Sequence, residues 1–334
     1  MKKIIVLGGT GFVGAHVCEK LVRDGWELTL PTRRRANADH LKHLPNVTTL
    51  EIDVQDEAAL AHAVAGHDAL VNLVAILHGT QAAFEQVHVA LPKKIAHACA
   101  AASVKQVVHI SALGADALQP ESSPSMYLRS KGEGEAVLMQ AAKGAVAGAA
   151  AHAGFDLTIL RPSVIFGAED KFINLFASLQ KVFPFMPLAG ASARFQPVWV
   201  EDVASAVVCC LNGASAAASP RIIEAFGPDV FTLKQLVQLA AQLSGISGGW
   251  GRPVISLPQW AGRLQATLMG LAPGEPMMSV DNLDSMKVDN VATGRQPGLA
   301  SIGILAAALR PIAKDYLTRN QSGSGLMGLR KRSH

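Results

Sequence analysis

Short apolar runs rich in β-branched residues alternate with longer segments of helical periodicity through the first half of the chain. This alternation is typical of βαβ units, whose strands pair in parallel. We expect strands at Lys3–Leu7, Glu27–Leu30, Thr48–Ile52, Ala69–Leu73, Gln106–Ile110 and Leu157–Leu160. Helices are expected between them, for example over Phe12–Arg23 and Ala82–Ala102. Continuous apolar strands such as Ile4–Leu7 indicate a sheet that helices cover on both faces.

The pattern changes after the sixth expected strand. Glycines, prolines and aromatic residues cluster between Phe166 and Trp199, and the strand–helix alternation loosens. We therefore expect a nucleotide-binding sheet domain over residues 1–165 and a smaller α/β region over 166–320, interleaved with the first and lying on the substrate side. Residues 321–334 are rich in Gly and Ser and basic, which predicts a disordered tail.

Composition excludes a disordered chain and a membrane-spanning one. Of the 334 residues, 49% are hydrophobic and only 17% charged, against about 25% charged in ordinary globular proteins. The longest uncharged stretch, Val203–Pro220, contains Asn, Gly, Ser and Pro, so it is not expected to cross a bilayer. The apolar run at Ile4–Leu7 is too short for a signal peptide.

The spacing of the cysteines and histidines and the distribution of charge indicate which ligands, compartment and partners to expect. The four cysteines form no CxxC pair and the eleven histidines no metal-binding spacing, so we expect buried thiols, no metal and a reduced, cytoplasmic protein. The net charge is +4, and the residues from Ala300 onward contribute +5 of it. The remainder of the chain is near neutral, and we expect no nucleic-acid partner.

A glycine-rich turn gives the strongest chemical signal. Gly8-Gly9-Thr10-Gly11-Phe12-Val13-Gly14 follows the first expected strand and opens the first expected helix. Glycine permits a tight turn and the close approach of a pyrophosphate, while the helix N-terminus offers amide donors. The expected cofactor-binding residues here are Gly8, Thr10, Gly11, Phe12, Val13 and Gly14. With the strand pattern, this predicts a Rossmann-like, doubly wound parallel sheet.

The spacing Gly8-x-x-Gly11-x-x-Gly14 resembles that of the short-chain dehydrogenase/reductase superfamily. The resemblance implies that Asp53 and Val54, after the third strand, hold the adenine ring of the cofactor. It also implies that Asn72, Leu73 and Val74, which end the fourth strand, line the ribose.

A basic run follows the second strand. NAD-binding proteins usually place an acidic residue there, whereas this chain has Arg33, Arg34 and Arg35 and no carboxylate before Asp39. Guanidinium groups can pair with the 2′-phosphate of NADPH, so we expect NADP(H) to be preferred over NAD(H). The alternative interpretation is a solvated basic loop.

Three residues could perform proton transfer. Ser111 follows the fifth strand, and Tyr127 and Lys131 stand at i and i+4 on one helix face sixteen residues further on. The lysine would lower the phenol pKa, the tyrosine would move a proton, and the serine would hydrogen-bond the substrate oxygen. Glu133 and Glu135 are expected to form surface pairs.

Further segments resemble extended, NAD-dependent epimerase/dehydratase-like members of this superfamily. They are Arg161–Gly167, Arg194–Ala204, Tyr127–Lys131 and Lys287–Val291. Together they are similar to one atypical branch, the nucleotide-binding accessory subunit of mitochondrial complex I and its bacterial relatives, over Lys2 to about Leu317. The resemblance implies that Pro162 and Val164 lie beside the nicotinamide. Leu7 and Phe166-Gly167 depart from the extended enzymes and argue against sugar-nucleotide epimerase activity.

Two functions therefore remain open. One is an NADP(H)-dependent reductase or dehydrogenase of a small, carbonyl or alcohol substrate, which could be lipophilic and quinone-related. The other is a non-catalytic NADPH-binding accessory, assembly or redox-sensing protein, with contact to a respiratory complex.

An apolar stripe near the C-terminus has two interpretations as well. Leu257, Trp260, Leu264, Leu268 and Leu271 recur every three or four residues. They could form a core or lid helix, or they could enter the interface of a membrane to which the basic tail (Arg330, Lys331, Arg332) is also attracted. The second interpretation would place the protein peripherally on the inner face of the membrane.

Overall fold

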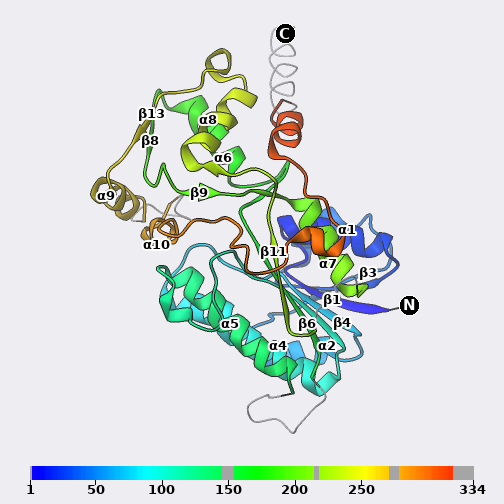
Figure 1. Cartoon of the computed structure of the whole chain (residues 1–334). Helices are drawn as coiled ribbons and strands as arrows, with labels where there is room; N and C mark the ends of the chain where they lie inside the picture. Colours follow the sequence, from blue (N-terminus) through cyan, green and yellow to red (C-terminus); the bar gives the residue numbers. More distant parts are fainter. Residues whose placement is uncertain (1, 145–153, 214–217, 271–277, 319–334) are drawn as a thin grey trace. The chain divides into compact units, whose positions relative to one another are not determined.

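The computed structural model describes residues 2–144, 154–213, 218–270 and 278–318. The chain divides into two compact units. The first contains Met1–Pro162, Glu201–Ala225 and Ala292–Leu305, and the second contains Ser163–Val200, Phe226–Val291 and Ala306–His334. The chain thus first changes unit after Pro162 and later returns twice to the first unit (Figure 1). The expected disordered tail, 321–334, lies outside the described residues.

A seven-stranded sheet forms the centre of the first unit within the described ranges. Its strand order is β11-β6-β5-β4-β1-β2-β3, and all neighbouring strands are parallel. The strands are β1 Lys3–Leu7, β2 Glu27–Thr32, β3 Val47–Glu51, β4 Ala69–Asn72, β5 Gln106–Ile110, β6 Asp156–Pro162 and β11 Arg221–Ala225. The chain reverses its direction of winding between β1 and β4, so the expected doubly wound, Rossmann-like fold is confirmed.

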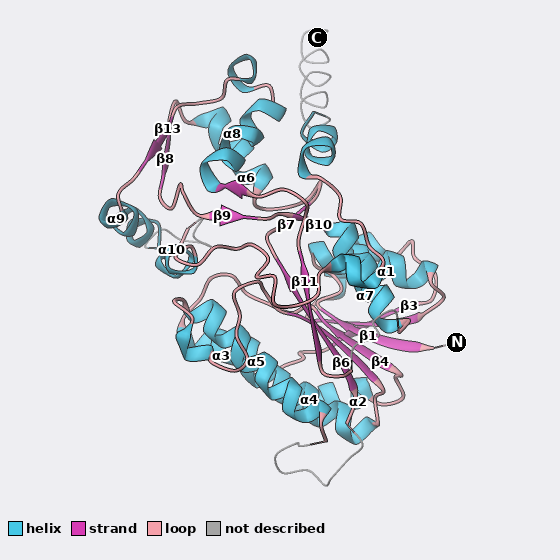
Figure 2. Ribbon diagram, viewed as in Figure 1, coloured by secondary structure: helices cyan, strands magenta, loops and turns pink. Residues whose placement is uncertain are grey.

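Helices cover both faces of this sheet, as the continuous apolar strands predict (Figure 2). The longer ones are α1 Phe12–Arg23, α2 Glu57–Val64, α4 Leu91–Ala102, α5 Met126–Ala142 and α7 Val200–Leu211. Helices α2, α4 and α5 lie together on one face, and α1 and α7 lie on the other. Leu60 of α2, Ile95 of α4 and Leu138 of α5 pack against Leu7 and Ile159 of the sheet in one buried cluster.

The predicted boundaries of β1, α1 and β5 are confirmed, and several others need correction. Strand β2 continues past the expected end at Leu30 to Thr32, and β6 gains Asp156, Arg161 and Pro162. Strand β3 starts and ends one residue earlier than expected, and β4 ends at Asn72. The single helix expected over Ala82–Ala102 is three segments: α3 Gln81–Glu85, a π-helical turn η2 at Gln86–Ala90, and α4.

The second unit combines short strand pairs with helices. Its elements are β7 Ile165–Phe166, α6 Ile173–Val182, β8 Met186–Leu188, β9 Arg194–Phe195, β10 Val198–Trp199, β12 Phe231–Thr232, α8 Leu233–Leu243, β13 Val254–Ser256, α9 Gln259–Gly270 and α10 Val280–Ser285. Strands pair as β7 with β10, β8 with β13, and β9 with β12. Phe176, Leu188, Leu236 and Tyr316 belong to its buried core. The Tyr316 hydroxyl donates to Asp170 Oδ2 at 2.9 Å, which satisfies that buried carboxylate.

Helix α9 carries the apolar stripe expected at 257–271, and the stripe does not face the core. The buried side of α9 is its small-residue side, Gly262 and Ala266, whereas Trp260, Leu264 and Leu268 are exposed. The core interpretation is therefore wrong for these three residues; Leu271 lies outside the described ranges. Among the helices that could be searched, none has the length and apolar character needed to cross a bilayer.

Candidate functional site

The glycine-rich turn adopts a conformation that side chains would obstruct. Gly8 has a φ of +81°, and a Cβ there would come 3.1 Å from the backbone of Leu73. A Cβ at Gly14 would collide with the backbone of Gly8 and Gly9, so α1 packs directly on the turn. Helix α1 begins after Gly11 without a side-chain cap or an acidic residue in its first turn. Its first amides therefore remain available for a pyrophosphate, and this cradle fits a dinucleotide.

The three arginines after β2 separate into two groups. Arg35 pairs with Glu51 of β3, with Nε 3.5 Å from Oε2. Arg33 and Arg34 are exposed and make no ion pair within the described residues. Strands β1 and β2 are adjacent and parallel, so these two arginines follow β2 at the same edge of the sheet as the glycine-rich turn. Their position fits the expected contact with a 2′-phosphate.

The family resemblance assigns several residues to the adenine and ribose of the cofactor. They differ in whether their polar atoms are already bonded within the protein. Asp53 is exposed; its Oδ1 accepts the Gln55 N–H, which leaves Oδ2 open. Val54 packs against the core cluster of the first unit. Asn72 is buried, and its amide oxygen accepts the Val74 N–H while its amide nitrogen donates to His109 Nδ1. Asn72 thus shapes the end of β4 through internal bonds, and a direct ribose contact by its side chain stays a prediction.

Lys131 reaches the carboxyl end of β5, where Ser111 follows the strand. Lys131 Nζ donates to the carbonyl of Ile110, the residue before Ser111, at 3.1 Å. Burial lowers the pKa of Lys131 to about 8, and the Glu135 carboxylate opposes that shift. The Ser111 hydroxyl is buried without a hydrogen-bond partner in the described structure. Tyr127 lies one turn before Lys131 on α5, and burial raises the pKa of its phenol to about 12.

His88 is a site residue that the sequence analysis did not single out. It lies on the π-helical turn η2, and its ring contacts the Tyr127 ring edge-on with centroids 5.5 Å apart. Its Nε2 accepts the Ile76 N–H, and its Nδ1 lies 2.9 Å from Ser130 Oγ. Burial, with the Lys131 and His109 charges, lowers its pKa to about 2. His88 is therefore neutral, with its proton on Nδ1 donated to Ser130.

His109 brings a second buried imidazole to the same strand end. Burial, together with the Lys131 charge, lowers its pKa to about 3. Because Nδ1 accepts from Asn72, the proton is on Nε2, which has no partner among the described residues. Ser111 directly follows β5, two residues after His109. Two unsatisfied polar atoms thus lie at this strand end, where open α/β sheets bind their ligands.

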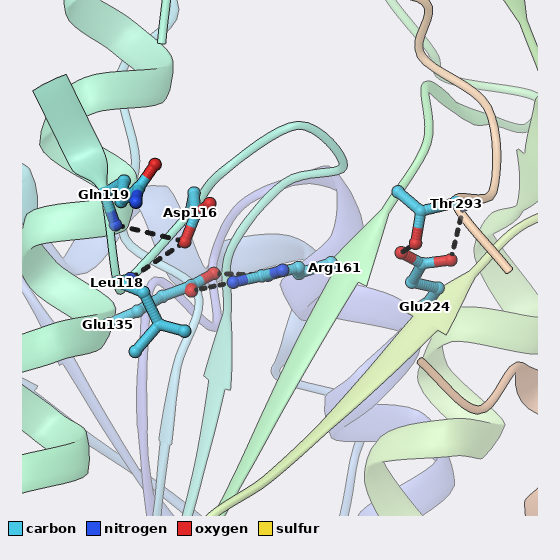
Figure 3. A network of polar contacts seen from close by, with 7 residues as sticks. All are labelled: Asp116, Leu118, Gln119, Glu135, Arg161, Glu224 and Thr293. Atoms are coloured by element: carbon cyan, nitrogen blue, oxygen red, sulfur yellow. Dashed lines mark hydrogen bonds and ion pairs between the residues drawn. The ribbon is translucent and has the colours of Figure 1, made fainter. Parts of the chain in front are cut away.

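Helix α5, which carries Tyr127 and Lys131, is held closely against the elements around it. A Cβ at Gly132 would collide with the Asp116 carbonyl, and one at Gly134 with the His88 carbonyl. Glycines inside a helix cost about 1 kcal/mol each, so their presence signals this close approach. Figure 3 shows the next contact along α5, where Glu135 meets Arg161 of β6.

The Glu135–Arg161 contact corrects an expectation from sequence. Glu135 is fully buried rather than on the surface, and Arg161 Nε donates to its Oε1 at 2.9 Å. In the same network, Glu224 of β11 accepts from the Thr293 hydroxyl at 2.6 Å and from its N–H at 2.9 Å (Figure 3). Strands β6 and β11 place Arg161 and Glu224 side by side. The network fixes α5 on the sheet and joins the late segment 292–305 to it.

The two residues expected beside the nicotinamide belong to different units. Pro162 ends β6 in the first unit, and its carbonyl accepts the Leu113 N–H at 2.9 Å. Val164 belongs to the second unit, where its N–H donates to Asn290 Oδ1 at 3.0 Å. Asn290 lies in the Lys287–Val291 segment and also accepts from the Ser163 hydroxyl at 2.6 Å. These contacts bring the two motifs, which are distant in sequence, together within the second unit.

Comparison with known proteins agrees with this geometry. Residues 8–181 match the NAD(P)H-binding family. The mitochondrial NADH dehydrogenase [ubiquinone] 1 alpha subcomplex subunit 9 of Mus musculus is 30% identical over 95% of this chain and 80% of its own length. A ceramide reductase of Caulobacter vibrioides is 27% identical over 61% of this chain and 59% of its own length.

The solved structures support the fold. The UDP-glucose 4-epimerase of Thermotoga maritima, in complex with UDP-glucose, superimposes with a TM-score of 0.68 over 96% of this chain and 99% of that one, at 16% identity. The family match therefore indicates an NAD(P)-binding protein, and the solved structure shows that its fold is that of this epimerase. The chain belongs to the NAD(P)H-binding family and, within it, to the family of the alpha subcomplex subunit 9 of NADH dehydrogenase.

Proposed function

We propose that this protein is an NADP(H)-dependent reductase or dehydrogenase of a carbonyl or alcohol substrate. The observation that carries the proposal is the strand end at β5, where the Ser111 hydroxyl is buried without a partner beside the buried ammonium of Lys131. A buried polar atom without a partner costs free energy, and a ligand oxygen would satisfy it. Family membership supplies the cofactor class.

The cofactor would lie along the carboxyl edge of the sheet. The Gly8–Gly14 turn and the first amides of α1 would hold the pyrophosphate, and Arg33 and Arg34 the 2′-phosphate. The Asp53 Oδ2 atom would accept from the adenine amino group. When bound, the nicotinamide supplies or accepts the hydride.

The chain's own residues would handle the proton and the developing charge. Ser111 Oγ would donate to the substrate oxygen, and Tyr127 Oη would pass its proton to that oxygen during reduction or take it back during oxidation. Lys131, protonated at pH 7, would stabilise the tyrosinate that remains. A lipophilic substrate, of the quinone or long-chain carbonyl class, is part of the proposal, and the relation to a ceramide reductase supports it.

A second candidate is a non-catalytic accessory or redox-sensing subunit that binds NADPH and contacts a respiratory complex. Two observations favour it. Relatives of this family are subunits of NADH dehydrogenase. In addition, burial raises the pKa of Tyr127 rather than lowering it, so the phenol of the unliganded chain is not activated.

A turnover assay separates the two candidates. NADPH oxidation should be followed with purified protein against quinones, long-chain aldehydes and keto-lipids, for the wild type and for Tyr127→Phe. The enzyme proposal expects substrate-dependent oxidation that falls by at least about a hundredfold in Tyr127→Phe, with unchanged NADPH affinity. Tight NADPH binding without turnover across the panel would support the accessory role instead.

A further inference from the structure

Helix α9 of the second unit presents large apolar side chains to solvent. Trp260 is 72% exposed, Leu264 55% and Leu268 60%. The opposite side of the helix, Gly262 and Ala266, packs on the unit, and a Cβ at Gly262 would come within 2.6 Å of the Ala189 side chain. Small residues therefore bring α9 close to its own core, and the bulky residues are left on the outer side.

The strand pair beside α9 continues this apolar character. Met186 and Leu188 of β8 are buried in the core, so the intervening Pro187 faces the other way, next to Ile255 of β13 in the parallel register. Ile255 is half exposed, as is Phe185, which precedes β8. Ala189, on which α9 packs, directly follows β8.

The segment before β13 adds the most exposed aromatic residue of this surface. Trp250 is 91% exposed, and Arg252 next to it donates to the Gln180 carbonyl of α6 at 3.2 Å. This contact holds Trp250 near the end of α6, where Val182 and Phe183 are also exposed. We call these residues together the apolar edge: Val182, Phe183, Phe185, Trp250, Ile255, Trp260, Leu264 and Leu268.

The two segments that form the apolar edge carry cations only, and one of these, Arg263, is paired with Asp284 of α10 at 3.2 Å. The segments that form it, 181–188 and 250–268, contain Lys181, Arg252 and Arg263 and no acidic residue. The second unit as a whole contains thirteen Lys and Arg residues against eight Asp and Glu, whereas the first contains seventeen against eighteen. That excess comes from residues 306–334, which contain six basic residues and one acidic, whereas residues 163–200 and 226–291 contain seven of each.

We propose that the apolar edge docks on the surface of an anionic lipid bilayer. The Trp, Phe and Leu side chains would enter the boundary between head groups and acyl chains, and Lys181 and Arg252 would pair with lipid phosphates. A second copy of the chain fits less well, because a symmetric contact would bring these cations against each other. The proposal stands independently of catalysis, since none of its residues belongs to the site on the first unit.

Vesicle sedimentation tests the proposal on the full-length protein. Phosphatidylcholine vesicles with and without phosphatidylglycerol would be compared at low and high salt. Binding should require phosphatidylglycerol, weaken with salt, and fall by at least about tenfold in the double variant Trp260→Ser/Leu264→Gln, because two large apolar side chains lose their burial. The matched control is Leu118→Gln/Leu305→Gln, which removes two even more exposed leucines from the first unit and should leave binding unchanged.

Tryptophan fluorescence gives an independent measure of insertion. The chain has four tryptophans, of which Trp26 is buried. Vesicles with brominated acyl chains should quench the wild type, and Trp260→Phe should lose a large part of that quenching while it still sediments with the vesicles.

Three outcomes would overturn the proposal. The first is a lack of binding to anionic vesicles at low salt. The second is binding that a chain ending at Asn320 loses but that Trp260→Ser/Leu264→Gln retains, because the tail alone would then bind lipid. The third is a dimer that the double variant dissociates without any vesicle binding, which would assign the apolar edge to self-association.

Discussion

The Nδ1 atom of His88 lies 2.9 Å from the Oγ atom of Ser130, and this contact joins the π-helical turn η2 to the second turn of α5. Ser130 in turn contacts Tyr127, because its hydroxyl donates to the Tyr127 carbonyl at 2.9 Å. The other ring nitrogen of His88 accepts the Ile76 N–H at 3.2 Å. One neutral imidazole thus connects the loop after β4 with the tyrosine of the candidate site.

Replacement of His88 by leucine should destabilise the protein. The variant would leave the Ile76 N–H without its acceptor and remove the His88 donor to Ser130, which is expected to lower the free energy of unfolding by about 1–3 kcal/mol. Urea unfolding measures the change. His62→Leu, at an exposed position of α2, is the control and should change the stability by less than about 0.5 kcal/mol. Equal stability of both variants would show that the His88 contacts make no net contribution to the free energy of unfolding.

Stability should fall in mild acid because of His88 and His109. The pKa of an unfolded histidine is near 6.5, whereas the folded chain holds these two pKa values at about 2 and about 3. The unfolded state therefore binds protons that the folded state does not, so the stabilisation is full above pH 6.5 and is lost as the pH falls below it. Each histidine contributes a slope of at most about 1.4 kcal/mol per pH unit.

Urea titrations at several pH values below 6.5 would measure this slope. His109→Gln should flatten it, while His62→Gln should keep the wild-type slope. A wild-type stability that does not change between about pH 7 and about pH 5 would contradict the buried, neutral state of both rings.

Two glycines of the turn should respond differently to substitution. Gly11 has φ −85° and ψ 177°, which valine adopts readily, and a Cβ there would lie an ordinary 3.4 Å from the Gly8 carbonyl. Gly11→Val should therefore fold normally and lose NADPH affinity by at least about a hundredfold, because the side chain fills the path of the pyrophosphate. Calorimetric titration and thermal unfolding would measure the two properties.

Gly14→Ala is the counterpart of this variant. Its Cβ would meet the backbone of Gly8 and Gly9, so we expect a loss of stability of about 1–3 kcal/mol even without cofactor. Wild-type NADPH affinity in Gly11→Val would show that the pyrophosphate does not pass this residue.

The cofactor preference should depend on two of the three arginines. NADPH should bind at least about tenfold more tightly than NADH, since charge-assisted contacts to a phosphate are worth about 1.5–3 kcal/mol. Arg33→Gln/Arg34→Gln should abolish that preference by weakening NADPH alone. Arg35→Gln is the control, because Arg35 is paired with Glu51. Equal affinities of the wild type for both cofactors would refute the role of Arg33 and Arg34.

The local sequence pattern was sufficient to predict much of the sheet domain. The first strand, the first helix and β5 have the boundaries that apolar runs and turn residues predict, since they are defined by short-range signals. Strand β2 continues past its expected end because it pairs with β3 as far as Thr32, beyond Thr29, where its pairing with β1 stops.

Long-range contacts explain what the pattern missed. The π-helical turn at 86–90 places His88 against Ser130 and Ile76, and no helical periodicity reveals partners that lie elsewhere in the chain. The burial of Glu135 depends on Arg161, which is equally distant. For α9, periodicity showed that one side was apolar but could not show that Gly262 and Ala266 would take the inner side.

The late return of the chain to the sheet has a consequence for synthesis on the ribosome. Strand β6 has an edge that is covered only when β11 pairs with it, and residues 163–200 of the second unit are made in between. The buried carboxylate of Glu224 in β11 gains its hydrogen bonds from Thr293 only after that later residue has been made. The nascent first unit therefore exposes this strand edge while residues 163–220 are made, a state that invites aggregation. Completion of the nucleotide-binding unit thus depends on nearly the last segment to emerge.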